Sequence, residues 1–297
     1  MKQNCLRFFI LFMILSVPVF VSCKEETDTE KTDIEEIDDG SYKVGDIVLS
    51  DGVRIRFSDR NSITEEQKEM AAGVIYFVYD PDSTDEISTY IKQSENSDVK
   101  KIKALAITLK HQRLTSWARM STTGYKTDFT EIKASELKIG TEAWSVIYNA
   151  LNGKVLSKDD YLYEFEGTPD AEPLYDEEDG WYITERGNGI FEQSNYPVFY
   201  YANSYAEENS LSDISFAGGF HIPSLAEFEK IADNIKTVQG SLDAVVSDMS
   251  LASLGRFWTS NQADDASSAD VYNFSTGSSS SASKSTETQA VTAFALY

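Results

Sequence analysis

The chain of 297 residues has very little cysteine, because Cys5 and Cys23 are its only two. Everything after residue 23 therefore lacks a thiol for a disulfide framework, a cysteine nucleophile or a thiolate metal site. Basic residues are also scarce, with 26 Lys and Arg against 49 Asp and Glu and a formal charge of −23. Such an acidic surface repels phosphate backbones, so we expect no nucleic-acid partner.

Catalytic motifs are equally scarce. His111 and His221 are the two histidines, and the sequence shows no cluster with the three or four ligands of a zinc site. It also has no Gly-x-Ser-x-Gly elbow and no glycine-rich phosphate loop. His221 lies in the apolar run Phe220–Ile222, where we expect a structural, hydrogen-bonded imidazole. The sequence therefore predicts no catalytic residue, no metal site and no cofactor.

One long apolar run is present, at residues 8–21, and it follows Lys2 and Arg7. The run is shorter than the roughly 20 residues of a membrane-spanning helix, which predicts a signal peptide over 1–22. Its end, Phe20-Val21-Ser22-Cys23, resembles a lipobox, with Cys23 as the site of lipid attachment. An ordinary signal peptide cleaved nearby is the alternative. Lys24-Glu25-Glu26 is similar to signals of surface lipoproteins, so we expect a surface-exposed lipoprotein of the cell outer membrane, held there by its lipid alone.

Acidic residues dominate the segment that follows, with nine Asp and Glu against two Lys between residues 24 and 40. Such a segment buries too little apolar surface to fold, which predicts an acidic disordered tether over 23–41. The rest, 42–297, has no internal repeat and no dividing linker. We expect it to form a single domain with a loop-rich insertion at about 156–189.

Short strands and few helices are expected in this domain. Asp51-Gly52 between alternating runs predicts a β-hairpin, and Thr64–Gln67 and Ser224–Glu227 predict capping boxes at helix starts. The first of these helices is expected to stop at Gly73. The remaining expected elements are strands at 74–79, 104–109, 256–260, 271–275 and 290–297, a helix at 141–152, and a helix or strand at 196–205. This mixture predicts an α+β domain whose last strand is paired inside a sheet.

Several motifs in the C-terminal part carry a family resemblance. In order they are Tyr196-Pro197-Val198-Phe199, Gly219-Phe220-His221-Ile222-Pro223-Ser224-Leu225, Phe257-Trp258-Thr259-Ser260, Phe274-Ser275-Thr276-Gly277 and Ala290-Val291-Thr292-Ala293-Phe294. This order resembles the C-type-lectin-fold domains related to formylglycine-generating enzyme, a family of bacterial surface proteins. The resemblance implies a C-type-lectin-like fold with short, twisted antiparallel strands and loop-rich insertions.

Departures from that family limit what the resemblance implies. Formylglycine generation uses a cysteine pair, which this domain lacks, so that activity is not expected. Thr292 stands where the closing strand usually has Arg, and the calcium-dependent sugar motif of animal lectins is absent.

The resemblance to one subgroup of this family, the variable proteins of diversity-generating retroelements, implies where the ligand-binding segment lies. In those proteins the segment after the Trp strand carries the ligand-binding residues, and here that segment is 261–288. The implied ligand-binding residues are Gln262, Asp264, Asp265, Ser267, Ser268, Asp270, Tyr272, Asn273, Ser279, Ser281, Lys284 and Thr286.

We therefore expect a monomeric, lipid-anchored binding protein that recognises an extracellular protein or glycan and is not an enzyme. Calcium at Asp264, Asp265 and Asp270 is an open alternative, although a polar loop is the simpler interpretation. A structural coat lipoprotein without a specific ligand and a surface glycan hydrolase that uses carboxylates also remain open.

Overall fold

The computed structural model describes residues 40–120, 122–151, 155–156, 174–176, 181–183, 195–211 and 217–297. Ser41–Tyr297 form one compact unit, and Arg56 Nη1 donates to the carbonyl oxygen of Ser41 at 2.8 Å. The predicted signal peptide, Cys23 and nearly all of the tether lie outside the described residues, as does most of the predicted insertion. Across the described part of the chain, no helix combines the length and apolar character needed to cross a membrane.

The described elements are mixed, as the α+β prediction requires. The strands are β1 (Ile47–Leu49), β2 (Arg54–Ile55), β3 (Ala71–Val78), β4 (Ala104–Thr115), β5 (Val155–Leu156), β6 (Leu174–Asp176), β7 (Trp181–Ile183), β8 (Ala217–His221), β9 (Arg256–Gln262), β10 (Ser268–Asn273), β11 (Ser278–Ser283) and β12 (Thr288–Leu296). The α-helices are α1 (Glu65–Met70), α2 (Glu86–Gln93), α3 (Ala143–Leu151), α5 (Pro197–Glu208), α6 (Leu225–Asp233), α7 (Ile235–Val245) and α8 (Leu251–Leu254). Short 3-10 helices are η1 (Phe57–Ser62), η2 (Val99–Lys101), η3 (Thr123–Tyr125), η4 (Thr130–Ile132) and η5 (Gly140–Glu142).

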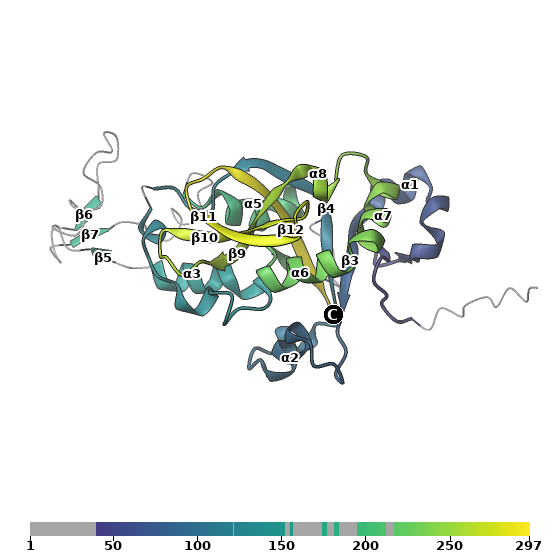
Figure 1. Cartoon of the computed structure of the whole chain (residues 1–297), viewed down its shortest axis with the longest axis horizontal. Coiled ribbons are helices and arrows are strands. Elements are labelled where there is room, and N and C mark those ends of the chain that lie inside the picture. Colours follow the sequence, from purple (N-terminus) through teal and green to yellow (C-terminus); the bar gives the residue numbers. More distant parts are fainter. Residues whose placement is uncertain are drawn as a thin grey trace, which may run out of the picture. The chain divides into compact units, whose positions relative to one another are not determined.

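Nine of these strands form one sheet in the order β11-β10-β9-β12-β4-β3-β1-β2, with β8 also paired to β12 (Figure 1). Its pairings are antiparallel, except that β12 meets β9 in parallel at Gln289 and Phe257. The last strand is therefore central, as predicted from its apolar sequence. β5, β7 and β6 make a separate three-stranded sheet.

Local sequence signals predicted several elements correctly. β1 and β2 form the expected hairpin around Gly52, whose φ is +87°, and both capping boxes are present at Thr64 and Ser224. The prediction that Gly73 ends the first helix is wrong, because this glycine lies inside β3. A Cβ there would come within 2.5 Å of the carbonyl oxygen of Ile107 and 2.6 Å of the Phe294 ring. Gly73 therefore allows neighbouring strands to approach.

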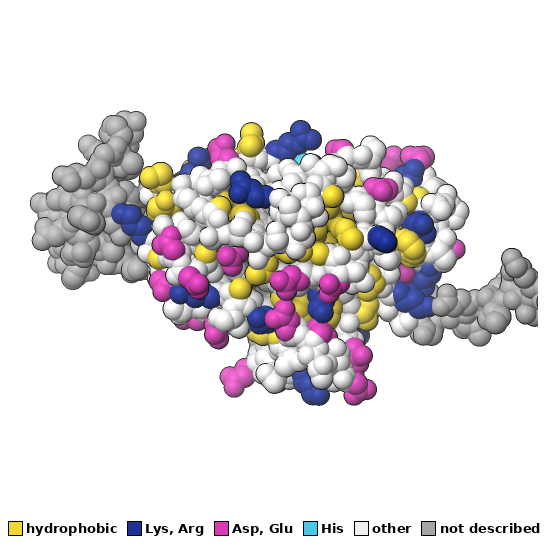
Figure 2. Space-filling view, in the orientation of Figure 1, with side chains coloured by type: hydrophobic (Ala, Val, Ile, Leu, Met, Phe, Trp, Pro, Cys, Tyr) yellow, Lys and Arg dark blue, Asp and Glu magenta, His cyan; other side chains and the backbone are white. Residues whose placement is uncertain are grey.

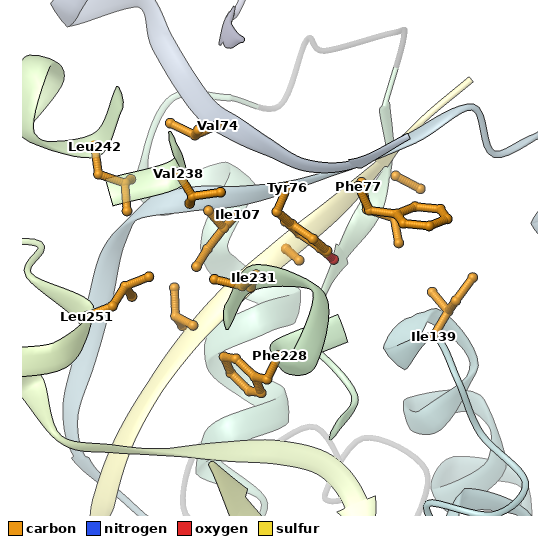
Figure 3. Close-up of a cluster of buried hydrophobic side chains, with 14 of the residues drawn as sticks. Val74, Tyr76, Phe77, Ile107, Ile139, Phe228, Ile231, Val238, Leu242 and Leu251 are labelled. Atoms are coloured by element: carbon orange, nitrogen blue, oxygen red, sulfur yellow. The ribbon is translucent and has the colours of Figure 1, made fainter. Parts of the chain in front are cut away.

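The main core lies where α6 and α7 pack on β3 (Figure 3). Tyr76 from β3, Phe228 from α6 and Val238 from α7 are all fully buried there. The alternate residues of β3, including Ile75, contribute to another cluster with Phe294. Side chains of a strand alternate between its faces, so both faces of β3 are covered.

A second large cluster is built around two tryptophans. The indole of Trp117 donates to the carbonyl oxygen of Thr259 at 3.2 Å, and that of Trp258 donates to the carbonyl oxygen of Thr115 at 2.8 Å. These two bonds tie the end of β4 to β9 in both directions. The helix α5, at residues where the sequence allows either a helix or a strand, adds Phe199 at 4.9 Å from Trp117, edge to face.

Glu227 is a buried polar hub between these elements. Its Oε1 accepts from Tyr76 Oη at 2.6 Å and pairs with His221 Nε2 at 2.8 Å. Its Oε2 accepts from the backbone N–H groups of Ser224 at 2.6 Å and Gly140 at 2.8 Å. Burial raises the pKa of Glu227, but His221 and these hydrogen bonds outweigh it and hold the pKa below the usual range. The carboxylate thus joins β3, β8, α6 and η5, and His221 is the structural imidazole that the sequence predicts.

Replacement of Gly140 by alanine should disrupt this junction. The added Cβ would lie 1.9 Å from the carbonyl oxygen of Ile222 and 2.9 Å from the His221 ring. We expect Gly140→Ala to lower the free energy of unfolding by about 3 kcal/mol, as measured by chemical denaturation. Gly219→Ala is the matched control, because nothing lies within 4 Å of its added Cβ, and it should cost less than about 0.5 kcal/mol. Equal stability of the two variants would contradict the packing described here.

Candidate functional site

The predicted ligand-binding segment folds as a hairpin at the outer edge of the sheet. β10 and β11 pair through six consecutive residue pairs without a bulge, and Gly277 completes the turn with a φ of +64°. Ser278, Ser279, Ser280 and Ser281 are all exposed, although successive residues of a strand point to opposite faces. Neither face of β11 is covered at these positions. Ser278 and Ser280 are not in the predicted ligand-binding set, because no local sequence pattern shows that a strand is uncovered on both sides.

The residues of the predicted ligand-binding set have very different exposures. Asp264, Asp265, Ser279 and Ser281 are exposed, and Ser267, Ser268, Asp270, Asn273 and Thr286 are half-buried. Gln262, Tyr272 and Lys284 are buried, so these three side chains do not belong to an exposed recognition surface. The register pairs Asp270 with Ser281 and Tyr272 with Ser279, which puts these four residues and Ser268 on one face of the hairpin.

Lys284 is fully buried directly after β11. Its ammonium donates to the carbonyl oxygens of Gly124 at 2.9 Å and Thr127 at 3.2 Å, and to Oε1 of Gln262 at 2.8 Å. The rings of Trp117 and Phe129 lie 4.7 and 5.0 Å from the same nitrogen. An ammonium has three N–H groups, so each has an acceptor. Burial lowers the pKa of Lys284 to about 7.

Gln262 extends the polar network around Lys284. Its Oε1 also accepts from the backbone N–H of Phe129 at 3.2 Å, and its Nε2 donates to Oδ1 of Asp128 at 2.5 Å. We call Lys284 and Gln262 the lysine clamp, because together they hold β9 and the end of β11 against residues 124–129. The sequence contains no signal for this role, since the partners of the clamp, three backbone groups and the Asp128 carboxylate, lie more than a hundred positions away.

Tyr272 is buried for a different reason. Its ring stacks on Phe228 of α6 at 5.9 Å between centroids and 9° between planes. Burial raises the pKa of Tyr272, with smaller contributions from the nearby carboxylates of Glu229 and Asp233. Figure 2 shows acidic side chains gathered over α6, beside the hairpin. α6 therefore covers this end of the hairpin face and leaves the Asp270 end open.

The three acids of this segment do not act as one site. Asp265 accepts from the backbone N–H and the hydroxyl of Ser267 and from the hydroxyl of Ser268, and these bonds lower its pKa. Burial, and less strongly the charge of Asp264, raises the pKa of Asp270 to about 6. Among the described residues, no group of three or more His, Cys, Asp or Glu side chains is arranged to hold a metal ion.

Comparison with known proteins gives one distant structural likeness. The chain is similar to a fimbrial protein from Bacteroides ovatus ATCC 8483, whose crystal structure was determined at 1.85 Å resolution, with a TM-score of 0.54 and 14% sequence identity. The match covers 86% of this chain and 49% of that protein, so the chain spans about half of its length. No protein-family model and no curated protein matches the sequence. At this identity the likeness concerns the fold alone, which is α+β and rich in antiparallel strands.

Removal of the buried ammonium should destabilise the whole unit. Lys284→Met leaves two backbone carbonyls without their donor and takes one of two donors from Gln262 Oε1, so we expect the free energy of unfolding to fall by about 3 kcal/mol. Lys100→Met is the control, because Lys100 is exposed, and it should change stability by less than about 0.5 kcal/mol. Denaturant titration of both variants checks the expectation, and an unaffected Lys284→Met protein would refute it.

Asp270 should make stability depend on pH. Its pKa is raised on folding from 3.8 to about 6, so its contribution is fully present below pH 3.8 and is lost as the pH rises through about 6. Asp270→Asn should therefore stabilise the chain by about 1 kcal/mol at about pH 7.5, after allowance for screening at this half-buried site, and should gain nothing near pH 4. Thermal melts at both pH values measure the difference.

Asp265→Asn is the control of opposite sign for this experiment. The hydrogen bonds that lower the pKa of Asp265 favour its charged form, so this variant should lose stability at neutral pH. If both substitutions stabilise the protein equally at neutral pH, general charge reduction explains the result and the assignment to Asp270 fails.

Proposed function

We propose that this chain is a lipid-anchored, non-catalytic binding protein of the cell surface. Its recognition surface, which we name the hairpin edge, consists of the exposed residues Asp264, Asp265 and Ser278–Ser281 with the half-buried Ser267, Ser268 and Asp270. The observation that carries the proposal is the exposure of Ser278–Ser281 on both faces of the outermost strand, next to the buried Lys284. A partner can therefore contact both faces of β11, while the buried Lys284 fixes the end of this strand.

The chemistry of the hairpin edge suits hydrogen-bonded recognition. Each serine hydroxyl both donates and accepts hydrogen bonds, and short side chains lose little conformational entropy when a ligand orders them. An outermost strand also presents unpaired backbone N–H and C=O groups. Extracellular proteins and glycans both offer matching donors and acceptors, and these are the ligand classes that we propose.

The finer fold assignment is part of this proposal. The motifs that resemble C-type-lectin-like domains occupy distinct elements: the Pro-Ser-Leu motif starts α6, the Trp258 motif is β9, and the closing motif is β12. Gly277 makes the turn between β10 and β11. Each motif thus lies at a boundary or a buried strand of the sheet, which supports a C-type-lectin-like domain of the formylglycine-generating-enzyme type.

Surface attachment rests on two separate observations. The lipobox-like segment that ends at Cys23 is a feature of the sequence. The similarity to a fimbrial protein agrees with a location on the cell surface. We infer a monomer, attached by lipid at Cys23 and extended by the acidic segment that follows.

A ligand screen tests the proposal. Residues Ser41–Tyr297, which form one compact unit, should be applied to glycan arrays and extracellular-protein arrays with and without calcium. We expect a ligand that binds without calcium. A blank on a sample shown to be folded by circular dichroism would instead favour a structural coat protein.

Variants of the hairpin edge locate the binding surface. Ser279→Arg/Ser281→Arg puts two bulky charged side chains on exposed positions and should weaken binding by at least about tenfold, with an unchanged melting temperature. Asn61→Arg/Ser62→Arg, also exposed but on η1, adds the same charge elsewhere and should leave binding intact. Equal effects of the two double variants would show a general charge effect and not a binding surface at the hairpin.

A further inference from the structure

A small pocket of about 220 Å³ lies away from the hairpin edge, where three distant segments meet. The connection from α2 to β4 contributes Asn96 and Asp98, η5 contributes Thr141 and Glu142, and β8 contributes Phe220 and His221. Ligand pockets for drug-sized molecules usually measure about 300 Å³ or more. This pocket is therefore suited to a single small molecule and not to a chain.

Two buried polar atoms in the lining of this pocket have no hydrogen-bond partner among the residues that the structure describes. They are Nδ1 of His221 and Oγ1 of Thr141. His221 is only 5% exposed, and its other ring nitrogen is used by Glu227. A buried polar atom without a partner destabilises a fold, so such atoms normally meet a ligand or water.

The other polar groups of the pocket are held in place. Glu142 accepts hydrogen bonds from the hydroxyl of Tyr90 and, at 3.0 Å, from the side-chain amide of Asn96. Gly140, next to Thr141, packs so closely on the His221 ring that a Cβ would lie 2.9 Å from it. Thr141 and His221 are therefore positioned by the same close contact between η5 and β8.

The unpartnered atoms define what a ligand must supply. Nε2 of His221 pairs with the Glu227 carboxylate, and Nδ1 takes either a donor or an acceptor according to the tautomer of the ring. The hydroxyl of Thr141 carries a proton that needs an acceptor. A ligand hydroxyl group is both donor and acceptor, whereas an ammonium only donates and a carboxylate or phosphate only accepts.

We propose that this pocket binds a small, neutral, hydroxyl-rich molecule, either a single sugar ring or a polyol. Its hydroxyl groups bond Nδ1 of His221 and Oγ1 of Thr141, and the carboxylates of Glu142 and Asp98 accept further ligand hydroxyls. Asp98 also pairs with Lys101 at 2.8 Å, so the carboxylate of Glu142 is the charge that disfavours anions such as sugar acids and phosphates. The site is separate from the hairpin edge and does not depend on its function.

Histidine NMR tests this site directly, because the chain has only two histidines. The full chain, solubilised in detergent and labelled at histidine, is titrated with glucose, galactose, mannose, N-acetylglucosamine and glycerol up to about 100 mM. We expect the His221 imidazole signal to shift and saturate with at least one of these probes. The His111 signal should stay unchanged, and the variant His111→Gln assigns the two signals.

Charged probes and variants complete the test. Glucuronate and methylamine should shift neither signal. Thr141→Val removes the hydroxyl and keeps the shape, so it should weaken binding by about tenfold. Ser260→Ala is the matched control, because its hydroxyl is also buried and unpartnered but lies outside the pocket lining, and it should bind normally.

Several outcomes would overturn the proposal. No saturable shift of His221 with any neutral probe would mean that the pocket holds water only. Stronger binding of glucuronate or methylamine would refute the ligand class. Unchanged binding by Thr141→Val, or an equal loss in Ser260→Ala, would show that the Thr141 hydroxyl does not contact the ligand.

Discussion

The buried ammonium of Lys284 is the interaction on which the C-terminal half of the sheet depends. Burial of a lysine is costly unless every N–H group is paired, and here two backbone carbonyls and Gln262 supply the three acceptors. The carbonyls belong to residues 124 and 127, in a stretch without β-strands whose buried backbone groups need partners. One side chain therefore stabilises both the irregular segment and the strand hairpin beside it.

Glu227 plays the corresponding role in the other half of the molecule. Four donors surround its carboxylate, and they come from β3, β8, η5 and the start of α6. Both centres join regular strands to short 3-10 segments, where apolar packing alone leaves backbone groups unpaired. Lys284 and Glu227 are each held by several hydrogen bonds with preferred directions. The segments around each of them can therefore adopt only a narrow range of positions. The loops that they hold are consequently fixed in position.

This arrangement separates the groups that stabilise the hairpin from the surface that we propose for recognition. The groups that stabilise the hairpin lie at its base, in Lys284, Gln262 and Tyr272, whereas the exposed serines of β11 contribute little to packing. Substitution of those serines should therefore leave the fold intact, as the proposed binding surface requires. The small pocket at His221 is similar. The Glu227 hub positions the His221 ring, whereas Nδ1 of that ring and Oγ1 of Thr141 have no hydrogen-bond partner among the described residues.

The sequence by itself determined the features that depend on near neighbours: both capping boxes, the hairpin at Gly52, the α+β class and the apolar closing strand. Local hydrogen bonds and side-chain periodicity determine these features, and both depend only on residues that are close together in the sequence. Only the tertiary structure decided that Gly73 belongs to a strand, that Lys284 and Gln262 are buried, and that the serine run is an uncovered edge. Each of those depends on contacts with residues distant in the chain, for which no local pattern exists. A lysine or glutamine beside a polar loop has the same sequence signature whether it meets water or three buried carbonyl groups.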